Sequence, residues 1–291
     1  MEGARHRAGS GGTFAANGEE LLLQRPQVVR HRLLEDLLEG GAQVVERLAH
    51  LRIIAPMCEQ YVAISSRPFA IGELWPFTER LERFGIAGFG WGVTWVGADG
   101  ELQSHRDIGS FRDDPSRDEI GAIETRALLV HLRRPSQFST IGMPDTQPFD
   151  DPAGRYAFSH NGDLEHHESF RKQFRDAGRL HGRADTEVSA RWLEDHWADA
   201  ATPTAALERL HDLFGGHANL AVLTRGGEAH HYAGNRENPV FRFGIGDIHL
   251  ACTGMYSLDR SLFSYVAPEA TNRSLVPFEH TASLQSEHVK A

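Results

Sequence analysis

The sequence predicts an α+β protein built from stacked layers of antiparallel sheet and helix, and not a parallel doubly wound sheet. Short β-branched and aromatic segments separated by glycine-rich turns occupy residues 58–132. Helical segments follow between 164 and 214, and short strand segments return between 219 and 253. Strands, then helices, then strands are typical of layers, because a parallel sheet needs strand and helix to alternate throughout.

The strands of the first half follow from their β-branched, aromatic and apolar residues and from the turns between them. Residues 61–65 are expected to form a strand that ends at Pro68. A hairpin is expected from residues 88–96 and 101–106, joined by a glycine-rich turn. Residues 127–132 form a nearly continuous apolar run, which is the pattern of a strand covered on both faces.

Helices dominate the middle of the chain, and strands close it. The expected helices are 118–125, 164–178, 185–197 and 204–214. Asp185 is placed as the N-cap of the third helix, and Gly215 stops the fourth. A strand at 156–160 ends at Asn161-Gly162, a pair that is common in tight turns. The returning strands are 219–224, 230–233, 240–245 and 248–253.

Composition favours a cytoplasmic protein that acts on small molecules or proteins. The 291 residues carry a net charge of -10, which argues against nucleic-acid binding because phosphate contacts need an excess of Lys and Arg. No apolar run approaches the ~18 residues of a membrane span, and residues 1–12 lack the apolar centre of a secretory signal. With two cysteines, Cys58 and Cys252, a disulfide framework is not expected, and Cys252 is interpreted as a packing residue.

No metal or cofactor is expected. The 17 histidines include His166-His167 and His230-His231, but adjacent side chains point to different sides of a helix or strand and do not readily share an ion. The chain also lacks the Gly-x-Ser-x-Gly elbow of the Ser-His-Asp hydrolases, which removes that interpretation.

Cys58 follows Met57 directly at the start of an apolar strand. If the chain began at Cys58, one residue would carry both a thiol and a free α-amine. An α-amine titrates near pH ~8, so its neutral fraction can take the thiol proton and later return it to a leaving group. We interpret Cys58 as a nucleophile; the alternative is that a lone cysteine before a strand is a small buried hydrophobe.

Residues 1–57 differ from the rest of the chain. Residues 28–54 are expected to form one helix or two, ended by Pro56. Three interpretations stay open: an amphipathic surface element, a propeptide packed over the site until cleavage, and a mis-assigned start with translation beginning at Met57. The last is favoured. The functional domain is therefore expected at residues 58–291.

Four segments occur in a particular order. They are Cys58 after methionine, VHLRRPS at 130–136, SHNGDLEHHESF at 159–170 and RADTEV at 183–188. Any one of these segments, taken by itself, occurs by chance in unrelated sequences. Their order, spacing and strand or helix context together resemble those of the class-II glutamine amidotransferases, which are N-terminal nucleophile hydrolases. The resemblance spans roughly residues 57–255 and indicates a small stand-alone member. It implies a four-layer αββα sandwich with two mainly antiparallel sheets between helical layers.

The resemblance implies a role for each matching residue. Cys58 attacks the side-chain amide of the substrate, and its α-amine is the general base. The side-chain amide of Asn161 and the backbone N–H of Gly162 form an oxyanion hole. Arg133 binds the substrate α-carboxylate, a task that suits a planar guanidinium, and Asp185 binds the α-ammonium group. From the residues alone, Arg133 is equally a surface ion-pair residue and Asp185 a helix cap.

Two departures from the family pattern bear on the substrate. Glu59-Gln60 follows the nucleophile in place of Gly-Ile, a form associated with stand-alone members. Ser-Gln-Phe at 136–138 replaces the usual Thr-His-Gly, and Ser136 is the candidate substrate-binding residue there. The contacts to the backbone end of the substrate are therefore expected to differ from those of the family.

The expected activity is glutamine amidotransferase or glutaminase-type amide hydrolysis through a Cys58 thioester. Two alternatives stay open: a γ-glutamyl peptide or amide hydrolase, and a non-catalytic binding or regulatory protein of the same fold in which Cys58 remains internal. Glutamine or a γ-glutamyl small molecule is the expected ligand. A separate ammonia-accepting synthase is a candidate partner, and no nucleic acid or membrane partner is expected.

Overall fold

The computed structural model describes residues 58–254 and 262–284. The chain divides into two units, Met1–Ala55 and Pro56–Ala291, and all described residues belong to the second. The helix expected across residues 28–54 and the junction at Met57 lie outside the described residues.

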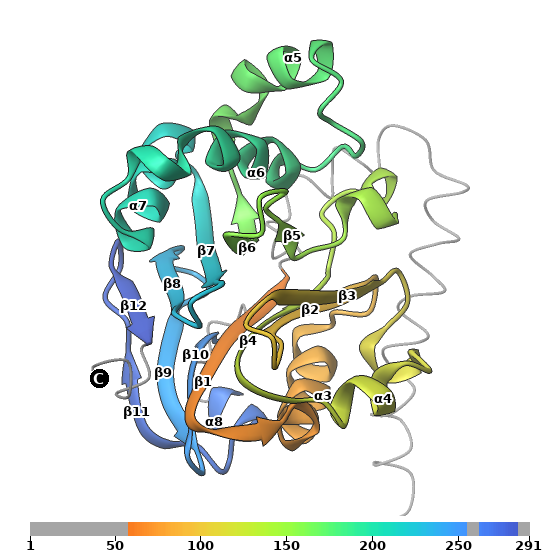
Figure 1. Cartoon of the computed structure of the whole chain (residues 1–291), viewed down its shortest axis with the longest axis vertical. Helices are drawn as coiled ribbons and strands as arrows, with labels where there is room; N and C mark the ends of the chain where they lie inside the picture. The colour runs from red at the N-terminus through yellow and green to blue at the C-terminus, as the bar shows by residue number, and fades with distance from the viewer. Residues whose placement is uncertain (1–57, 255–261, 285–291) are drawn as a thin grey trace, which may run out of the picture. The chain divides into compact units, whose positions relative to one another are not determined.

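A seven-stranded antiparallel sheet begins directly after Cys58 (Figure 1). Its spatial order is β11-β9-β10-β1-β4-β2-β3. The strands are β1 (Glu59–Ala70), β2 (Trp91–Val96), β3 (Leu102–Asp107), β4 (Glu124–Leu132), β9 (Val240–Ile245), β10 (Ile248–Thr253) and β11 (Thr271–Leu275). The strand that follows Cys58, β1, lies in the centre between β10 and β4 and pairs antiparallel with both.

A second, five-stranded sheet has the order β12-β8-β7-β6-β5, again with antiparallel neighbours. Its strands are β5 (Phe149–Asp150), β6 (Tyr156–Asp163), β7 (His217–Thr224), β8 (Ala229–Gly234) and β12 (Thr281–Leu284). The chain visits this sheet in its middle and returns to the first sheet through β9 and β10. The last two strands, β11 and β12, extend one edge of each sheet.

Helices cover the outer face of each sheet (Figure 1). The α-helices are α3 (Trp75–Gly85), α4 (Arg117–Gly121), α5 (Glu168–Asp176), α6 (Asp185–His196), α7 (Pro203–Phe214) and α8 (Leu262–Val266). Short 3-10 helices occupy Ile71–Leu74, Phe111–Asp113, Phe138–Thr140, Met143–Asp145, Glu165–His167 and Trp197–Asp199. Within the described residues no helix has both the length and the apolar character needed to cross a membrane.

Three clusters of buried apolar side chains separate the four layers. Trp75 and Leu81 of α3 and Phe263 of α8 pack on the outer face of the first sheet. Val188 of α6 and Leu210 of α7 pack on the outer face of the second sheet. The third cluster lies between the sheets, and many of its members are alanines: Ala127, Ala157, Ala221, Ala229, Ala233, Ala251 and Ala282. Such small side chains allow the sheets to approach closely, and the predicted four-layer αββα sandwich is confirmed.

Most of the predicted elements are present. The hairpin is β2–β3, and residues 127–132 lie within β4, which is buried from Ala127 to Leu132. The returning strands correspond to β7, β8, β9 and β10, and the helix at 204–214 corresponds to α7, followed by Gly215 in the left-handed region. Cys252 is fully buried in the outer core of the first sheet, and both cysteines are free.

Three local predictions are wrong. Strand β1 does not end at Pro68, because the pairing with β4 shifts register between Ile64 and Phe69 and the irregular segment accommodates the proline. The helix at 118–125 shrinks to α4, since its last residues already pair within the first sheet. Asn161 and Gly162 do not form a turn: they continue β6 to Asp163 and pair with β7.

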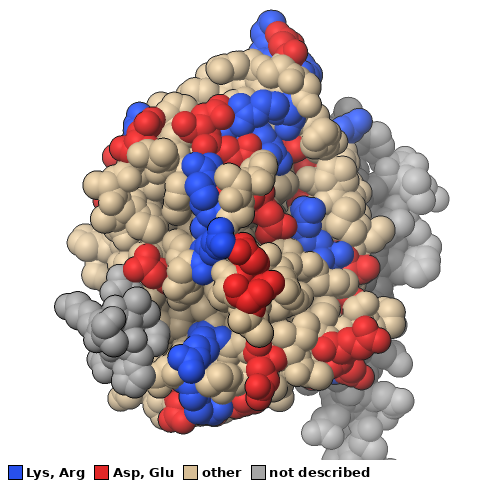
Figure 2. All heavy atoms as spheres, viewed as in Figure 1, with Lys and Arg blue, Asp and Glu red and all other residues tan. Residues whose placement is uncertain are grey.

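Charges of both signs mix on the surface. On the face seen in Figure 2, Lys and Arg side chains lie beside Asp and Glu side chains rather than apart from them. Ion pairs between described residues include Arg67 with Glu73 and Asp247, and Arg225 with Glu101. Exposed pairs of this kind contribute little to stability.

Candidate active site

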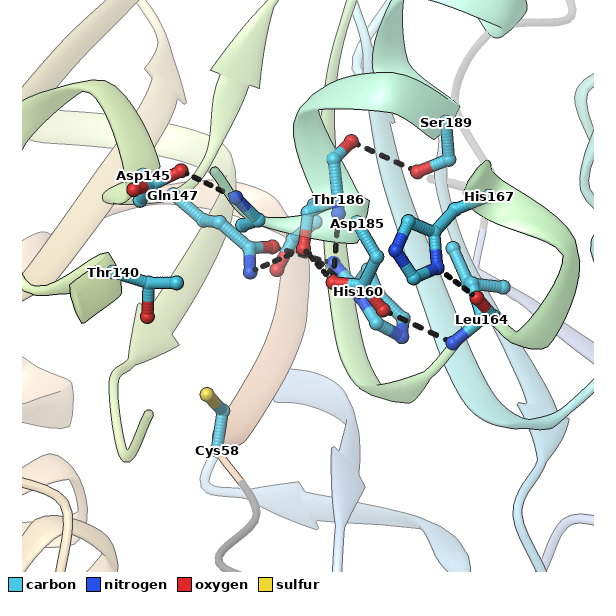
Figure 3. A network of polar contacts seen from close by, with 12 residues as sticks. Cys58, Thr140, Asp145, Gln147, His160, Leu164, His167, Asp185, Thr186 and Ser189 are labelled. Atoms are coloured by element: carbon cyan, nitrogen blue, oxygen red, sulfur yellow. Dashed lines mark hydrogen bonds and ion pairs between the residues drawn. The ribbon is translucent and has the colours of Figure 1, made fainter. Parts of the chain in front are cut away.

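Cys58 lies directly before β1 and faces the second sheet. Side chains alternate along a strand, and Val62 belongs to the cluster between the sheets, so Cys58 and Gln60 point the same way. The backbone N–H of Arg134 donates to the Cys58 sulfur at 3.3 Å, and the sulfur lies 3.6 Å from the Arg134 carbonyl oxygen. Figure 3 shows the thiol at the end of β1, with the polar residues around Asp185 on the neighbouring elements.

The surroundings of the Cys58 thiol keep it protonated at neutral pH. Burial raises its pKa, while the positive charge of Arg133 and the Arg134 N–H act in the opposite direction; the carboxylates of Glu59 and Asp185 raise the pKa further. Since the thiolate is the attacking form of cysteine, a base has to remove the proton. Among residues 58–254 and 262–284, the hydrogen-bond partners of the sulfur are backbone groups of Arg134, and no side-chain base contacts it.

Arg133 follows β4 and is buried beside Cys58. Its Nη2 donates to the backbone oxygen of Thr140 at 2.5 Å and to the Thr140 hydroxyl at 2.8 Å. Its backbone N–H donates to the carbonyl oxygen of Gly90 at 2.8 Å, which fixes the start of the loop that follows β4. The Nε of Arg133 is buried and has no hydrogen-bond partner within the described part of the chain. Thr140 therefore holds the guanidinium from one side, and a donor is left over for an anionic ligand.

Asn161 is fully buried in β6, and neither the nitrogen nor the oxygen of its side-chain amide has a hydrogen-bond partner among the described residues. Its ladder partner on β7, Asn219, is also buried, but the Asn219 amide bonds to Asn238 and Asn235. A buried amide without a partner costs about 1–3 kcal/mol. A bound ligand or an ordered water would satisfy such a group.

Gly162 adopts a backbone conformation that only glycine accepts easily. Its φ is +127°, and a Cβ atom at this position would lie 1.9 Å from the carbonyl oxygen of His217 on β7. Close approach of β6 and β7 therefore requires glycine here.

We expect Gly162→Ala to destabilise the protein by more than the ~1–3 kcal/mol of backbone strain alone, because the methyl group also displaces β7. Gly154→Ala is the matched control, since Gly154 has φ +66° but a methyl group added there would meet no atom of the described residues within 4 Å. Urea unfolding of both variants measures the difference. Equal losses would show that the His217 contact is not what requires glycine.

Asp185 is the first residue of α6 and contacts two backbone N–H groups. Its Oδ2 accepts from Leu164 at 3.0 Å and its Oδ1 from Thr186 at 2.8 Å. The N-cap prediction is wrong by one position, because Ala184 has the extended backbone of the cap. Asp185 nevertheless joins the start of α6 to the end of β6, and its carboxylate lies 3.9 Å from the ring of His160.

A network of hydrogen bonds holds Asp185 and the start of α6 in place (Figure 3). The Asp145 carboxylate accepts from the backbone N–H groups of Arg183 and Ala184, both at 2.7 Å. Gln147 accepts from the backbone N–H of His160 at 2.6 Å and donates to the Thr186 hydroxyl at 3.2 Å. The loop before β5 therefore fixes the position of Asp185.

Sequence reasoning did not identify this network. Asp145 and Gln147 stand out in the sequence only as part of a polar loop, because their partners are elsewhere in the chain. His160 came closest to being identified, because it directly precedes Asn161 in the motif at 159–170.

Ser136 lies in the loop between β4 and β5 and is exposed. The same loop carries Phe138, which is 75% exposed and has its ring centroid 6.3 Å from that of Phe89. The structure thus gathers Cys58, Arg133, Asn161, Gly162 and Asp185 at one end of the sandwich and leaves Ser136 on the surface beside them. Within the described residues, no three His, Cys, Asp or Glu side chains gather as a metal site would require.

Comparison with solved structures identifies the fold. The chain superposes on the glutamine phosphoribosylpyrophosphate amidotransferase of B. subtilis with a TM-score of 0.57 and 17% sequence identity, over 79% of this chain and 50% of that one. It superposes on a structure described as the allosteric regulatory enzyme of purine biosynthesis with a TM-score of 0.58 and 16% identity, over 79% and 49% of the two chains. A glutamine aminotransferase class-II domain protein from Silicibacter pomeroyi also matches, with a TM-score of 0.48 and 17% identity over 78% and 98%.

The chain has the N-terminal nucleophile hydrolase fold of the class-II glutamine amidotransferases, and the fold expected from the four motifs is confirmed. It spans about half the length of the first two proteins. No model of a known protein family matches the sequence, and no curated protein matches it either.

Proposed function

We propose that the protein hydrolyses the side-chain amide of glutamine, or of a γ-glutamyl compound, through a thioester on Cys58. One observation carries the proposal: the thiol of Cys58 and the unpartnered buried amide of Asn161 lie at the same end of the space between the two sheets, within the described residues. Acyl transfer requires a nucleophile and an oxyanion donor close to each other, and two facing strands supply them here.

The first half of the reaction forms the thioester. The α-amine of Cys58 takes the proton from the sulfur, and the thiolate attacks the amide carbon. Negative charge that develops on the carbonyl oxygen is stabilised by the Asn161 amide and the Gly162 backbone N–H. The intermediate then collapses: the C–N bond breaks, and the proton held by the α-ammonium group goes to the leaving ammonia or amine.

The second half regenerates the enzyme. Water attacks the thioester carbon while the α-amine accepts its proton, the C–S bond breaks, and a glutamate side-chain carboxylate is released. The proton returns to the sulfur. This cycle needs no cofactor, and it uses the α-amine twice as base and twice as acid.

Arg133 and Asp185 give the site its preference for an α-amino acid. The Nε of Arg133, which has no hydrogen-bond partner among the described residues, supports contact with the substrate α-carboxylate. The partly exposed carboxylate of Asp185 supports contact with the α-ammonium group. Opposite charges on two elements recognise a zwitterion, which selects glutamine or a free γ-glutamyl group over an internal peptide residue.

A γ-glutamyl amide or peptide is the second candidate substrate. It is favoured by the exposed loop at Ser136 and Phe138, which adds accessible surface beside the site. The exposed side chains of this loop are available to contact a substrate larger than free glutamine.

The experiment that tests the proposal is the intact mass and N-terminal sequence of the protein expressed from its own upstream region, followed by a glutamate-release assay. We expect a chain that begins at Cys58, consistent with a functional domain of residues 58–291. Glutamine and γ-glutamyl amides should both be offered, with asparagine as the control, because each true substrate releases glutamate. A chain that retains Met57 and releases no glutamate would favour a non-catalytic binding protein.

A further inference from the structure

Gln60 connects the two sheets directly behind Cys58. It lies on the same face of β1, two residues further along, and is fully buried. Its Oε1 accepts from the hydroxyl of Ser159 on β6 at 2.7 Å, and its Nε2 donates to the backbone oxygen of Asn219 on β7 at 3.1 Å. One side chain of the first sheet thus bonds to two adjacent strands of the second.

The two partners of Gln60 flank Asn161. Ser159 precedes Asn161 by two residues and therefore lies on the same face of β6. Asn219 is the ladder partner of Asn161 on β7. The hydrogen bonds of Gln60 therefore hold Asn161 through two of its neighbours: the residue two positions before it on β6 and its ladder partner on β7.

The direction of each hydrogen bond is determined. A carbonyl oxygen only accepts, so the Gln60 Nε2 points to Asn219 and its Oε1 to Ser159. Ser159 therefore gives its single proton to Gln60 and accepts from the Nδ1 of His131, which lies 2.8 Å away. His131 is the ladder partner of Gln60 on β4. Burial holds the pKa of His131 well below its usual value, so the ring stays neutral.

The apolar cluster between the sheets does not provide such directional contacts. Ladder hydrogen bonds act within a sheet, and the cluster consists largely of small apolar side chains such as Ala157, Ala221 and Ala251. Apolar contacts resist separation but set no particular register. The hydrogen bonds of Gln60 and Ser159 therefore supply directional contacts that join the start of β1 to β6 and β7 across the sheets.

We propose that Gln60 is a positioning residue that holds Cys58 at reacting distance from the oxyanion donors Asn161 and Gly162. This inference rests on the proposed function. Gln60 touches neither the substrate nor the sulfur in this scheme; it acts by joining the strand of the nucleophile to the strands of the oxyanion hole. A displacement of ~1 Å in such a site can cost about a hundredfold in rate.

The test is steady-state kinetics of Gln60→Leu in the protein expressed from its own upstream region, with glutamate release as the readout. Leucine keeps much of the volume but makes neither hydrogen bond. We expect kcat to fall about ten- to a hundredfold with KM within about threefold, because substrate binding by Arg133 and Asp185 is untouched. The rate of Cys58 alkylation by iodoacetamide should stay the same, since the thiol keeps its own contacts.

A double-mutant cycle with Asn161→Ala separates positioning from general structural damage. If Gln60 acts through the oxyanion hole, Gln60→Leu costs little further rate once Asn161 is already alanine. Full additivity of the two losses would overturn the proposal. Val62→Ala is the matched control. Val62 lies on the same face of β1, two residues further from Cys58 than Gln60, and its truncation should lower the unfolding midpoint without lowering kcat.

Ser159→Ala provides a second variant in case Gln60→Leu does not fold. It removes one of the two bonds and should lower kcat by a smaller factor with unchanged KM. Wild-type kcat in both folded variants would overturn the inference, provided that Cys58→Ala is inactive and Asn161→Ala has the lowered kcat that the proposed function expects. Loss of activity in none of the four variants would instead overturn the proposed function itself.

Discussion

Replacing Cys58 with alanine abolishes glutamate release, with an expected loss of at least about ten-thousandfold in kcat, because the thioester can no longer form. The loss is confined to chemistry. Cys58 precedes β1 and its sulfur contacts only backbone groups of Arg134 among the described residues, so the sheet keeps its ladder partners in the variant. Circular dichroism and the urea midpoint should match the wild type within experimental error.

Cys252→Ala is the control for this experiment. Cys252 is the other cysteine of the chain, fully buried among the apolar side chains of the outer core, on the face of the first sheet opposite to the one that Cys58 shares with Gln60. The variant should lose stability through the vacated volume while retaining turnover. Retained turnover in Cys58→Ala would remove the thioester mechanism, and loss in both variants would point to damage of the fold.

A mass measurement refines the same prediction. Incubation with a γ-glutamyl substrate followed by acid quenching should trap an adduct on Cys58 in the wild type. The adduct should be absent from Cys58→Ala and present in Cys252→Ala. This readout identifies the acylated residue directly, and the adduct accumulates when hydrolysis of the thioester is slower than its formation.

Local patterns predict most strands of this fold because the residues within each strand are enough to indicate it. The segments that became β7 to β10 alternate or run apolar over a few residues, and each ends at a glycine or polar turn. Helix α3 escaped prediction for the opposite reason. Its core-facing side includes Thr78, which bonds to Tyr61, and Glu82, which accepts from Phe111, so polar residues interrupt the apolar period.

The residues of the candidate site likewise divide into those that the sequence predicts and those that it does not. Cys58, Arg133, Asn161 and Asp185 stand in recognisable motifs, and the structure brings them to one end of the sandwich. The residues that support them carry no local signal: Gln60 and Ser159 are 99 positions apart, and Gln147 and Thr186 are 39 apart. Pairings of this kind depend on the three-dimensional packing of strands, which one sequence does not reveal.

Replacing Asn161 with alanine should lower kcat by about a hundred- to a thousandfold, the usual cost of one oxyanion donor, with little change in KM. The charge on the carbonyl oxygen exists in the transition state and not in the bound amide, so the loss falls on the chemical step. Stability should be preserved or slightly increased, because the amide of Asn161 has no partner among the described residues of the unliganded protein and its removal relieves a buried polar group.

Asn219→Ala makes this prediction sharp, because it removes the same side chain from the ladder partner of Asn161. The Asn219 amide is satisfied at both ends, by the carbonyl of Asn238 at 2.8 Å and the N–H of Asn235 at 3.2 Å. Its removal leaves buried groups without partners and should destabilise the protein by about 1–3 kcal/mol. Kinetics and urea unfolding of the pair should therefore show opposite patterns: Asn161→Ala loses rate and keeps stability, whereas Asn219→Ala loses stability. If Asn161→Ala instead unfolds as readily as Asn219→Ala and keeps its kcat, Asn161 is a structural residue and the oxyanion is bound elsewhere.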